Sequence, residues 1–370
     1  MTSNIFREIC KSTLLRYNEF QFLQHEEKEV TELARKLLSI LLALCLLLST
    51  GLALAAERTP KPIQTIPYEE ISPTVEGQHH YLLLCTDLWK GKVRPADAPP
   101  PTQENGKRRD LYGNTDGIVL VTLDTRAHRI MLTSFIRDAL IKKPNDGIGR
   151  INYVYNDYGP EALCKVISQH IDVKVEDYLL FDFTQIANIV DYLGGVDIEL
   201  NASEIEYLRR YAVPAGSVRS VETGADLRSG GTHRPGLYHF KGHSAVIYMR
   251  IRKAGGGGDF MRTQRARTVM STLADKCREI TWEEAEALVN NIMDNNTMTN
   301  INLEGMLDAA RYAYSLRDCT IEELRLPPDG AVTPITFAAM AAQEVDWDIC
   351  RQSMANYLQN SFLVIEDEED

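Results

Sequence analysis

The feature that most constrains this chain is a run of twenty uncharged residues from Leu37 to Ala56. At 1.5 Å per residue, a helix of this length spans a hydrocarbon core of about 30 Å. Arg35 and Lys36 stand directly before the run, and basic residues favour the cytoplasmic side of a membrane. We therefore expect residues 1–36 to be cytoplasmic, 37–56 to be a single-pass anchor in the cell membrane, and the remainder to be extracellular.

An alternative reading of the same segment is a cleaved signal peptide, because Ala53-Leu54-Ala55 resembles a signal-peptidase site. We favour the anchor, since the leader before the apolar run is long for a signal peptide. Residues 57–78 are rich in proline and threonine and are predicted to form an extracellular spacer. The folded domain is then expected to begin near His79.

The charge balance limits the possible partners. With a formal net charge of −12 and a pI near 5.3, the chain is a poor candidate for binding nucleic acid, which requires a basic surface. An anionic ligand must therefore meet a local cluster of arginines. The cysteines of the extracellular part are odd in number and form no CxxC pair, so we expect buried thiols and leave one disulfide open.

Hydrophobic patterning predicts an α/β fold class. Short strand-like runs alternate with helical patterns, and a long helix is predicted from Phe260 to Cys277. We assign one catalytic domain to residues 79–330 and a C-terminal helical extension with an acidic tail to residues 331–370. The strand-like runs are Tyr81 to Cys85, Gly117 to Leu123, Ile130 to Phe135, Tyr178 to Phe183 and Val196 to Leu200.

Two groups of arginines indicate an anion site. Arg250 and Arg252 are two residues apart after an apolar run, so on a strand both would project from one face. Arg262 and Arg265 occupy the amino-terminal end of the apolar stripe of the predicted helix and should face inward. A helix amino terminus adds positive potential, which makes a phosphate the natural guest, although pairing with Asp259 or surface acids is the alternative for any single arginine.

Two carboxylates indicate a metal site. Asp87 ends one predicted strand and Asp116 precedes another, so they could meet at neighbouring strand ends. Mg²⁺ takes one or two carboxylates together with phosphate oxygens and water, although turn and capping roles would explain either residue alone. His239 and His243 lack a third zinc ligand at a useful spacing, so we interpret them as structural.

A family resemblance joins these pieces. The segments that carry it are Asn114-Thr115-Asp116-Gly117, Ile136-Arg137-Asp138, Arg150-Ile151-Asn152 with Tyr155, Val190 to Asp197, Tyr248 to Arg252 and Asp259 to Arg265. In this order they resemble the LytR-CpsA-Psr family from about Tyr81 to Pro328. The resemblance implies a three-layer α/β/α domain with a central mixed sheet, and a polyprenyl diphosphate ligand whose tail enters an apolar pocket.

The resemblance also implies roles for individual residues. The family pattern puts Arg137, Arg250, Arg252 and Arg262 on the diphosphate, with Arg265 as a weaker member, Asp87 and Asp116 at Mg²⁺, and Asp259 beside the reacting centre. The sequence departs from the pattern at Asn114, Gly117 and Ala266, where the family has arginine, threonine and glutamine. A long insertion from Trp89 to Tyr112 lies beside the expected metal site.

The function implied is that of a Mg²⁺-dependent phosphotransferase. It would attach a glycopolymer, such as teichoic acid or capsular polysaccharide, from a polyprenyl diphosphate carrier at the membrane to peptidoglycan. In this interpretation Asp116, Arg137, Asp259 and Arg262 are catalytic. Two alternatives remain open, namely a pyrophosphatase acting on the same donor and a non-catalytic carrier-binding protein of envelope assembly.

Overall fold

The computed structural model describes residues 59–88, 103–104, 107–108, 112–210, 213–251, 254, 258–295 and 297–363. The predicted cytoplasmic segment and anchor lie outside the described residues, as does most of the insertion after Trp89. No helix in the described part is long and apolar enough to cross a membrane. The anchor therefore remains a prediction from sequence.

A six-stranded sheet forms the centre of the domain, in the order β12-β8-β1-β4-β5-β13. Strand β1 pairs parallel to β8 and antiparallel to β4, and β5 pairs parallel to β13, so the central sheet is mixed, as expected. The strands are β1 (Gln78–Thr86), β4 (Thr115–Asp124), β5 (Arg129–Phe135), β8 (Asp177–Phe181), β12 (Met298–Thr299) and β13 (Thr320–Leu326).

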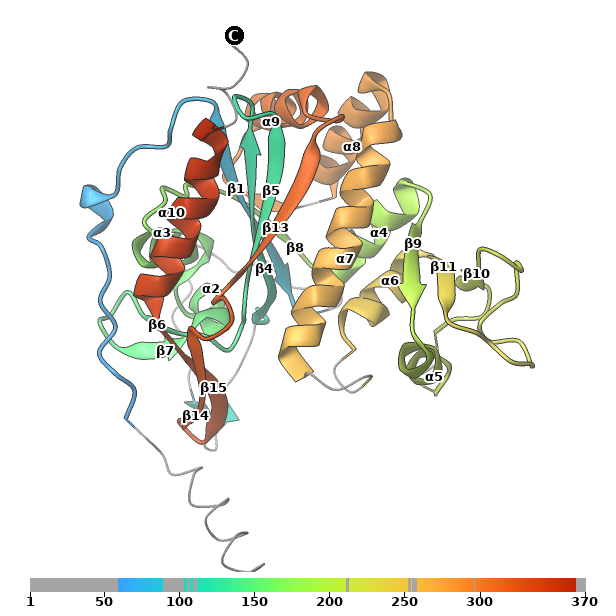
Figure 1. Cartoon of the computed structure of the whole chain (residues 1–370), viewed down its shortest axis with the longest axis horizontal. Helices are drawn as coiled ribbons and strands as arrows, with labels where there is room; N and C mark the ends of the chain where they lie inside the picture. Colours follow the sequence, from blue (N-terminus) through green and yellow to red (C-terminus); the bar gives the residue numbers. More distant parts are fainter. Residues whose placement is uncertain are drawn as a thin grey trace, which may run out of the picture. The chain divides into compact units, whose positions relative to one another are not determined.

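Helices cover both faces of this sheet (Figure 1). Side chains alternate between the faces of a strand, and in β1 Leu82 and Leu84 pack with α3 (Pro160–Ile171) and α10 (Trp347–Leu363). Tyr81 and Leu83 point the other way, toward α8 (Trp282–Asp294) and α9 (Leu303–Ser315), with α7 (Gly258–Glu279) beside them. Because both faces are covered, the strands are apolar along most of their length, which explains why they were predictable.

A smaller lobe stands at the right of Figure 1 and has its own hydrophobic core. Its three-stranded sheet has the order β10-β11-β9. Gly242 begins α6 so close to α4 that an added Cβ would stand 1.9 Å from the Ala187 carbonyl oxygen, so only glycine allows this packing. The lobe and its neighbours are α4 (Phe183–Tyr192), β9 (Val196–Leu200), α5 (Ala202–Arg210), β10 (Val218–Ser220), β11 (Gly236–Phe240) and α6 (Gly242–Met249).

Short elements connect these parts. They are the 3-10 helices η1 (Tyr68–Glu70) and η2 (Ile151–Tyr153), the hairpins β2 (Gln103–Glu104) with β3 (Lys107–Arg108) and β6 (Leu140–Lys142) with β7 (Ile148–Arg150), and the helix α2 (Val154–Tyr158). Five cysteines in the described part, Cys85, Cys164, Cys277, Cys319 and Cys350, are free thiols, so none of them forms a disulfide.

Two boundaries differ from the sequence prediction. Much of the predicted spacer lies on the domain, since Ile71 is buried and the Ile66 amide donates to the Gln169 carbonyl over 3.0 Å. The C-terminal region is not wholly helical, because a hairpin of β14 (Val332–Phe337) and β15 (Met340–Val345) precedes α10. It is also no appendage, because α10 supplies side chains to the main core.

The first testable consequence concerns α10. Trp347 is 4% exposed and its indole N–H donates to the Leu140 carbonyl over 2.9 Å. We expect Trp347→Ala to lower the free energy of unfolding by about 3–5 kcal/mol, because it leaves a cavity in the main core. Ile349→Ala, at a neighbouring position that is 41% exposed, is the control and should cost no more than about 0.5 kcal/mol. Urea denaturation measures both, and equal losses would contradict this packing.

Two buried histidines make the fold sensitive to acid. Burial lowers the pKa of His80 to about 4, helped by the nearby His79. Burial also lowers the pKa of His170 to about 4. The Lys142 backbone N–H donates to Nε2 of His170 over 3.0 Å, so the ring proton sits on Nδ1, which faces the Val166 carbonyl. Protonation of Nε2 would place its N–H opposite the Lys142 N–H, so that two donors would face each other with no acceptor.

These pKa values fix the direction of the pH dependence. Both histidines bind a proton more weakly in the folded state, so their contribution is complete above pH 6.5 and is lost as the pH falls toward 4. The expected loss is roughly 3 kcal/mol for each histidine. Denaturation at a series of pH values should show this decline, and His170→Gln should make it shallower. A stability that rises from pH 6.5 to 4 would contradict the assignment.

Candidate functional site

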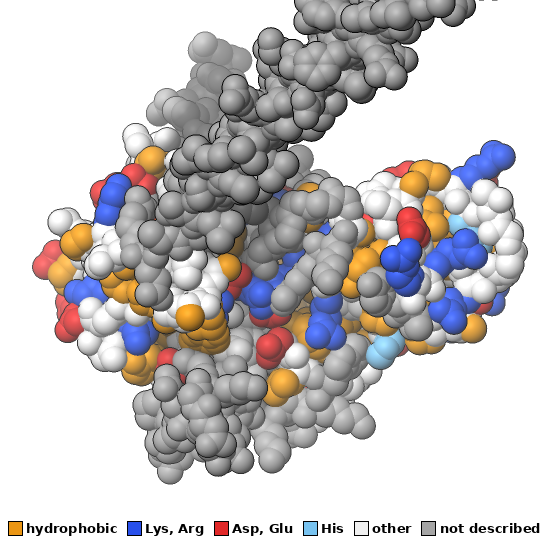
Figure 2. Space-filling model, turned by 90° about the horizontal axis from the view of Figure 1, so that it is seen from below, with side chains coloured by type: hydrophobic (Ala, Val, Ile, Leu, Met, Phe, Trp, Pro, Cys, Tyr) orange, Lys and Arg blue, Asp and Glu red, His pale blue; other side chains and the backbone are white. Residues whose placement is uncertain are grey.

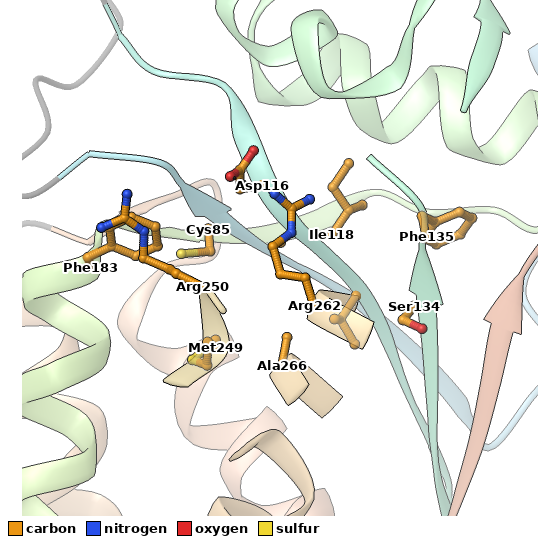
Figure 3. Close-up of a pocket in the computed structure, with 12 residues that line it drawn as sticks. Cys85, Asp116, Ile118, Ser134, Phe135, Phe183, Met249, Arg250, Arg262 and Ala266 are labelled. Carbon is orange, nitrogen blue, oxygen red and sulfur yellow. Dashed lines mark hydrogen bonds and ion pairs between the residues drawn. The ribbon is translucent and has the colours of Figure 1, made fainter. Parts of the chain in front are cut away.

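An irregularity in the central sheet sets the position of the central carboxylate of the site. Cys85 on β1 pairs with Gly117 on β4, but the next residue, Thr86, pairs with Thr115. Asp116 is therefore the extra residue of a β-bulge at the end of the sheet, and a bulge redirects a side chain out of the regular alternation. The Asp116 carboxylate is thereby placed at the mouth of a pocket (Figure 3).

Two arginines from different elements grip this carboxylate. Nη1 of Arg137, just after β5, lies 2.6 Å from Oδ1 of Asp116. Nη1 of Arg262, in the first turns of α7, lies 3.1 Å from Oδ2, and Figure 3 shows the Arg262 side chain reaching toward Asp116. All three side chains are largely buried. Together with Asp138 and Arg150, which extend this network, three arginines meet two carboxylates, and the excess of positive charge favours an incoming phosphate.

A second carboxylate, that of Asp138, extends this cluster. Asp138 Oδ2 lies 3.4 Å from Nε of Arg137, and Asp138 Oδ1 lies 3.0 Å from Nη1 of Arg150. The ion pairs thus run from Arg150 through Asp138, Arg137 and Asp116 to Arg262. The sequence singled out Asp138 and Arg150 only as parts of motifs, and their pairing across β6 and β7 had no signal in residue spacing.

Arg250 joins the same pocket from the lobe side. It follows the end of α6, it is exposed, and its guanidinium lies 4.6 Å from the centre of the Phe183 ring. Tyr248 and Met249 complete a helix that packs on α4, so Arg250 follows a helix and not the strand on which it would share a face with Arg252. The pocket holding Arg250 and Arg262 is also lined by Cys85, Asp116, Phe183 and Ala266. Arg252 lies outside the described residues.

Arg265 has a different role from the one expected. It is 1% exposed, and its Nε donates to Glu204 on α5 over 2.8 Å. Its other two nitrogens donate to the carbonyls of Ile251 and Ala254 over 2.9 and 3.0 Å. The inward direction predicted from the helical stripe is confirmed, but these three partners commit the guanidinium to fastening α7 to the lobe. Arg265 does not line the charged pocket.

The two predicted metal ligands lie at adjacent strand ends. Asp87 follows β1, and its Oδ1 accepts the Asn114 amide over 2.9 Å, while the Asp87 amide donates to the Asn114 carbonyl. Burial raises the pKa of the Cys85 thiol, and the charges of Asp116, Asp182 and Asp87 raise it further. No group of three potential metal-ligating side chains occurs in the described part.

The structure describes Asp259 only in part and describes His239 fully. The backbone of Asp259 lies in the first turn of α7, but its side chain is outside the described part. His239 contacts Asp197 across β11 and β9, with Nδ1 2.7 Å from the carboxylate, which agrees with a structural role.

An apolar cavity of about 400 Å³ lies behind the charged pocket. Its walls are one face of the central sheet and the facing sides of α4, α7, α8 and α9. Along α7 its lining runs from Ala266 to Arg278, roughly 18 Å at the rise of a helix. Residues lining both compartments are Cys85, Gly117, Val119, Met249 and Ala266. The cavity therefore adjoins the charged pocket.

The sequence indicated only the part of the cavity wall that α7 contributes. The predicted apolar stripe of α7 continues through Val269 and Leu273, which both line it. The walls contributed by α8 and α9 could not be distinguished from ordinary core positions, since an apolar stripe has the same pattern in both cases.

Comparison with known proteins identifies the family. The sequence profile of the LytR-CpsA-Psr family matches residues 69–352, which is most of the chain. The chain belongs to the LytR-CpsA-Psr family. Its mixed α/β domain with arginines at one edge of the sheet is accordingly the domain of that family, and the expectation drawn from the sequence motifs is confirmed.

Curated relatives are distant. Biofilm regulatory protein A of Streptococcus mutans is 24% identical over 225 residues, covering 59% of this chain and 52% of that protein. The polyisoprenyl-teichoic acid–peptidoglycan teichoic acid transferase TagT of Bacillus subtilis is 23% identical over 224 residues, covering 60% of this chain and 64% of that protein. The matched segment thus spans about half to two thirds of these relatives.

Solved structures share the fold of this LytR-CpsA-Psr domain. TagT bound to LIIa-WTA superposes with a TM-score of 0.57 at 19% identity, covering 81% of this chain and 96% of that chain. The family protein YwtF (TagT) with bound octaprenyl pyrophosphate lipid gives a TM-score of 0.53 at 17% identity, covering 82% and 98%.

The reassignment of Arg265 is testable by stability. Arg265→Ala leaves the Glu204 carboxylate buried without its cation, so we expect a loss of about 3–5 kcal/mol in the free energy of unfolding. Replacing both partners, as Arg265→Met with Glu204→Met, should recover much of this loss. The control is Arg210→Ala on the same helix as Glu204, where an exposed pair with Glu206 contributes about 0.5 kcal/mol or less. A neutral Arg265→Ala would contradict the role.

Proposed function

We propose that this chain is a Mg²⁺-dependent phosphotransferase that attaches a glycopolymer from a polyprenyl diphosphate carrier to peptidoglycan. The observation that carries the proposal is the direct junction of a pocket with excess positive charge and a long apolar cavity. An amphiphile with an anionic head and a hydrocarbon tail matches both compartments at once. The bound lipid in the YwtF (TagT) structure and the transferase name of TagT agree with this ligand class.

The arginines have a clear task in this reaction. When an acceptor hydroxyl of peptidoglycan attacks the phosphorus that carries the glycan, the bond to the bridging oxygen breaks and polyprenyl phosphate leaves with extra negative charge. Arg262 and Arg250 line the pocket, and Arg137 pairs with the other oxygen of the Asp116 carboxylate that holds Arg262. Preorganised cations stabilise developing charge without reorganising, which lowers the barrier. Arg252, next to this group in sequence, is proposed as a further contact.

The residues present fit a Mg²⁺ ion that is completed by its substrate. Asp87 and Asp116 supply two carboxylates at adjacent strand ends, and Mg²⁺ normally takes one or two carboxylates with phosphate oxygens and water. When bound, the ion would neutralise diphosphate charge. A diphosphate that draws Arg137 and Arg262 toward itself would also release the Asp116 oxygens from their ion pairs.

The proton of the acceptor hydroxyl needs a base, and Asp259 is proposed for it. It lies in the same helical turn as Arg262, which faces the pocket. A neighbouring guanidinium lowers the pKa of a carboxylate and weakens it as a base. An Asp259→Asn variant with the full transfer rate would remove this assignment.

Two departures from the family pattern fall at the junction of the compartments. Gly117 and Ala266 both line the charged pocket and the apolar cavity. A Cβ at Gly117 would stand 3.1 Å from the Cβ of Cys85, so a larger residue there requires this strand pair to give way. We infer that these small residues shape the passage for the first units of the tail and leave the arginine cluster intact.

The location proposed for the reaction follows from the sequence. The uncharged segment from Leu37 to Ala56 would anchor the chain in the cell membrane and hold the catalytic domain outside. The carrier lipid and the peptidoglycan acceptor are then both within reach. This arrangement is a proposal, since the segment lies outside the described residues.

The test is a transfer assay with the full-length chain in detergent. A synthetic polyprenyl diphosphate glycan is incubated with peptidoglycan fragments and Mg²⁺, and products are resolved by mass spectrometry. We expect a glycan–peptidoglycan conjugate that chelation abolishes and that Arg262→Ala or Asp116→Ala reduces by about 10²–10³-fold, the loss typical of removing one charge-stabilising group. Arg311→Ala, an exposed pair on α9, is the control and should keep the wild-type rate.

The other possible outcomes of this assay distinguish the two alternative functions. Free glycan with no conjugate would mean a pyrophosphatase, and donor binding with no product would mean a carrier-binding protein. Unchanged transfer in excess chelator would refute the metal requirement while leaving the donor assignment in place.

A further inference from the structure

The lobe carries a local excess of basic residues. Residues 202–241 contain six Lys and Arg against four Asp and Glu, whereas the whole chain contains 40 against 52. Figure 2 shows Lys and Arg side chains gathered on this lobe, at the right of the view. Four exposed arginines define what we call the lobe surface: Arg209, Arg219, Arg228 and Arg234.

These four guanidinium groups lack carboxylate partners within 4.0 Å in the part of the chain that the structure describes. Nη1 of Arg228 donates to the Arg209 carbonyl over 3.2 Å, and Nη1 of Arg219 donates weakly to the Gly224 carbonyl over 3.4 Å. By contrast, Arg210 pairs with Glu206 over 2.9 Å, one helical turn away. The positive charge of the lobe surface is therefore not neutralised by direct pairing.

Three of the four acids in this stretch are committed elsewhere. Glu204 is buried against Arg265, and Glu206 pairs with Arg210. Asp226 accepts the amides of Gly216 and Arg228 over 2.6 and 3.0 Å, and the bond from Arg228 is the main reason that its pKa is lowered. The Asp226 carboxylate thus holds the loop in shape, and Glu222 alone remains exposed without a partner among the described residues.

The lobe surface is joined firmly to the charged pocket. The Arg265–Glu204 pair ties α5 to α7 about one helical turn from Arg262. The core of the lobe also includes Val269 of α7 and Met249 of α6, and Met249 lines the pocket. A ligand held at the pocket and a second group held on the lobe are therefore positioned by one packed framework.

We propose that the lobe surface binds the phosphate groups of an anionic glycopolymer. Arg is suited to phosphate because its planar fork donates two parallel hydrogen bonds. A single exposed contact contributes little, but four arginines engaging successive phosphates of one chain act together. The inference rests on the proposed function in one respect, namely that the polymer is the cargo of the donor, and it specifies a phosphate-bearing cargo over a neutral one.

The experiment measures polymer affinity separately from lipid affinity. Full-length chain in neutral detergent is titrated with soluble poly(glycerol phosphate) and with neutral dextran. We expect saturable, salt-sensitive binding of the phosphate polymer only. Replacing all four arginines of the lobe surface by alanine should weaken it by about tenfold, and replacing them by lysine should retain most of it. The control variant replaces four exposed cations elsewhere by alanine: Lys61, Arg126, Lys165 and Arg311.

A second ligand keeps the two proposals distinguishable. Farnesyl diphosphate, which has the head and a short tail but no polymer, should bind the lobe variant as well as the wild type, and Arg262→Ala should lose farnesyl diphosphate while keeping the polymer. If the variant with all four lobe-surface arginines replaced by alanine is folded and binds the polymer with wild-type affinity, the proposed role of the lobe surface is wrong. An equal loss in the control variant, or binding of anionic phospholipid vesicles without binding of the polymer, would contradict it too. Failure of Arg262→Ala to affect farnesyl diphosphate would count only against the proposed donor site.

Discussion

The pairing of Asp116 with Arg137 and Arg262 is the interaction on which the site depends. It joins the beginning of β4, the segment after β5 and the beginning of α7. Two guanidinium groups that contact one carboxylate would repel each other in its absence. The Asp116 carboxylate therefore allows Arg137 and Arg262 to lie close together. The same carboxylate reaches that position only because the β1–β4 ladder contains a bulge.

Much of the fold was predictable because both faces of the central sheet are covered. Strands such as β1 and β4 are apolar on both sides and stand out as short runs, and α4 carries a regular apolar stripe ending at Gly194 and Gly195. The cluster of Asp116, Arg137 and Arg262 was foreseen through the resemblance of motifs. Their geometry was not, since residue spacing cannot reveal a bulge in the register of two strands.

The differences between the sequence predictions and the structure have a common physical cause. The run from Ala245 to Met249 before Arg250 is short and apolar, and such a run fits a strand or a buried helix equally well until its packing partner is known. Arg265 has the same inward direction as Arg262, yet one meets the Glu204 carboxylate and the other meets Asp116. What an inward arginine does is decided by the element opposite to it. The hairpin before α10 was hidden because alanines in β15 have little strand preference.

Helix α7 has a consequence for how this architecture can vary. Its first turns contact the charged cluster, its middle fastens the lobe, and its later turns line the apolar cavity, all on one continuous rod. Inserting a single residue would rotate everything beyond it by about 100°, because a helix has 3.6 residues per turn. The α7 side chains that line the apolar cavity would then turn away from it, while Arg262 would keep its place at the charged pocket. The charged pocket and the apolar cavity can therefore change by exchange of side chains along α7, whereas an insertion or deletion within this helix would break their alignment.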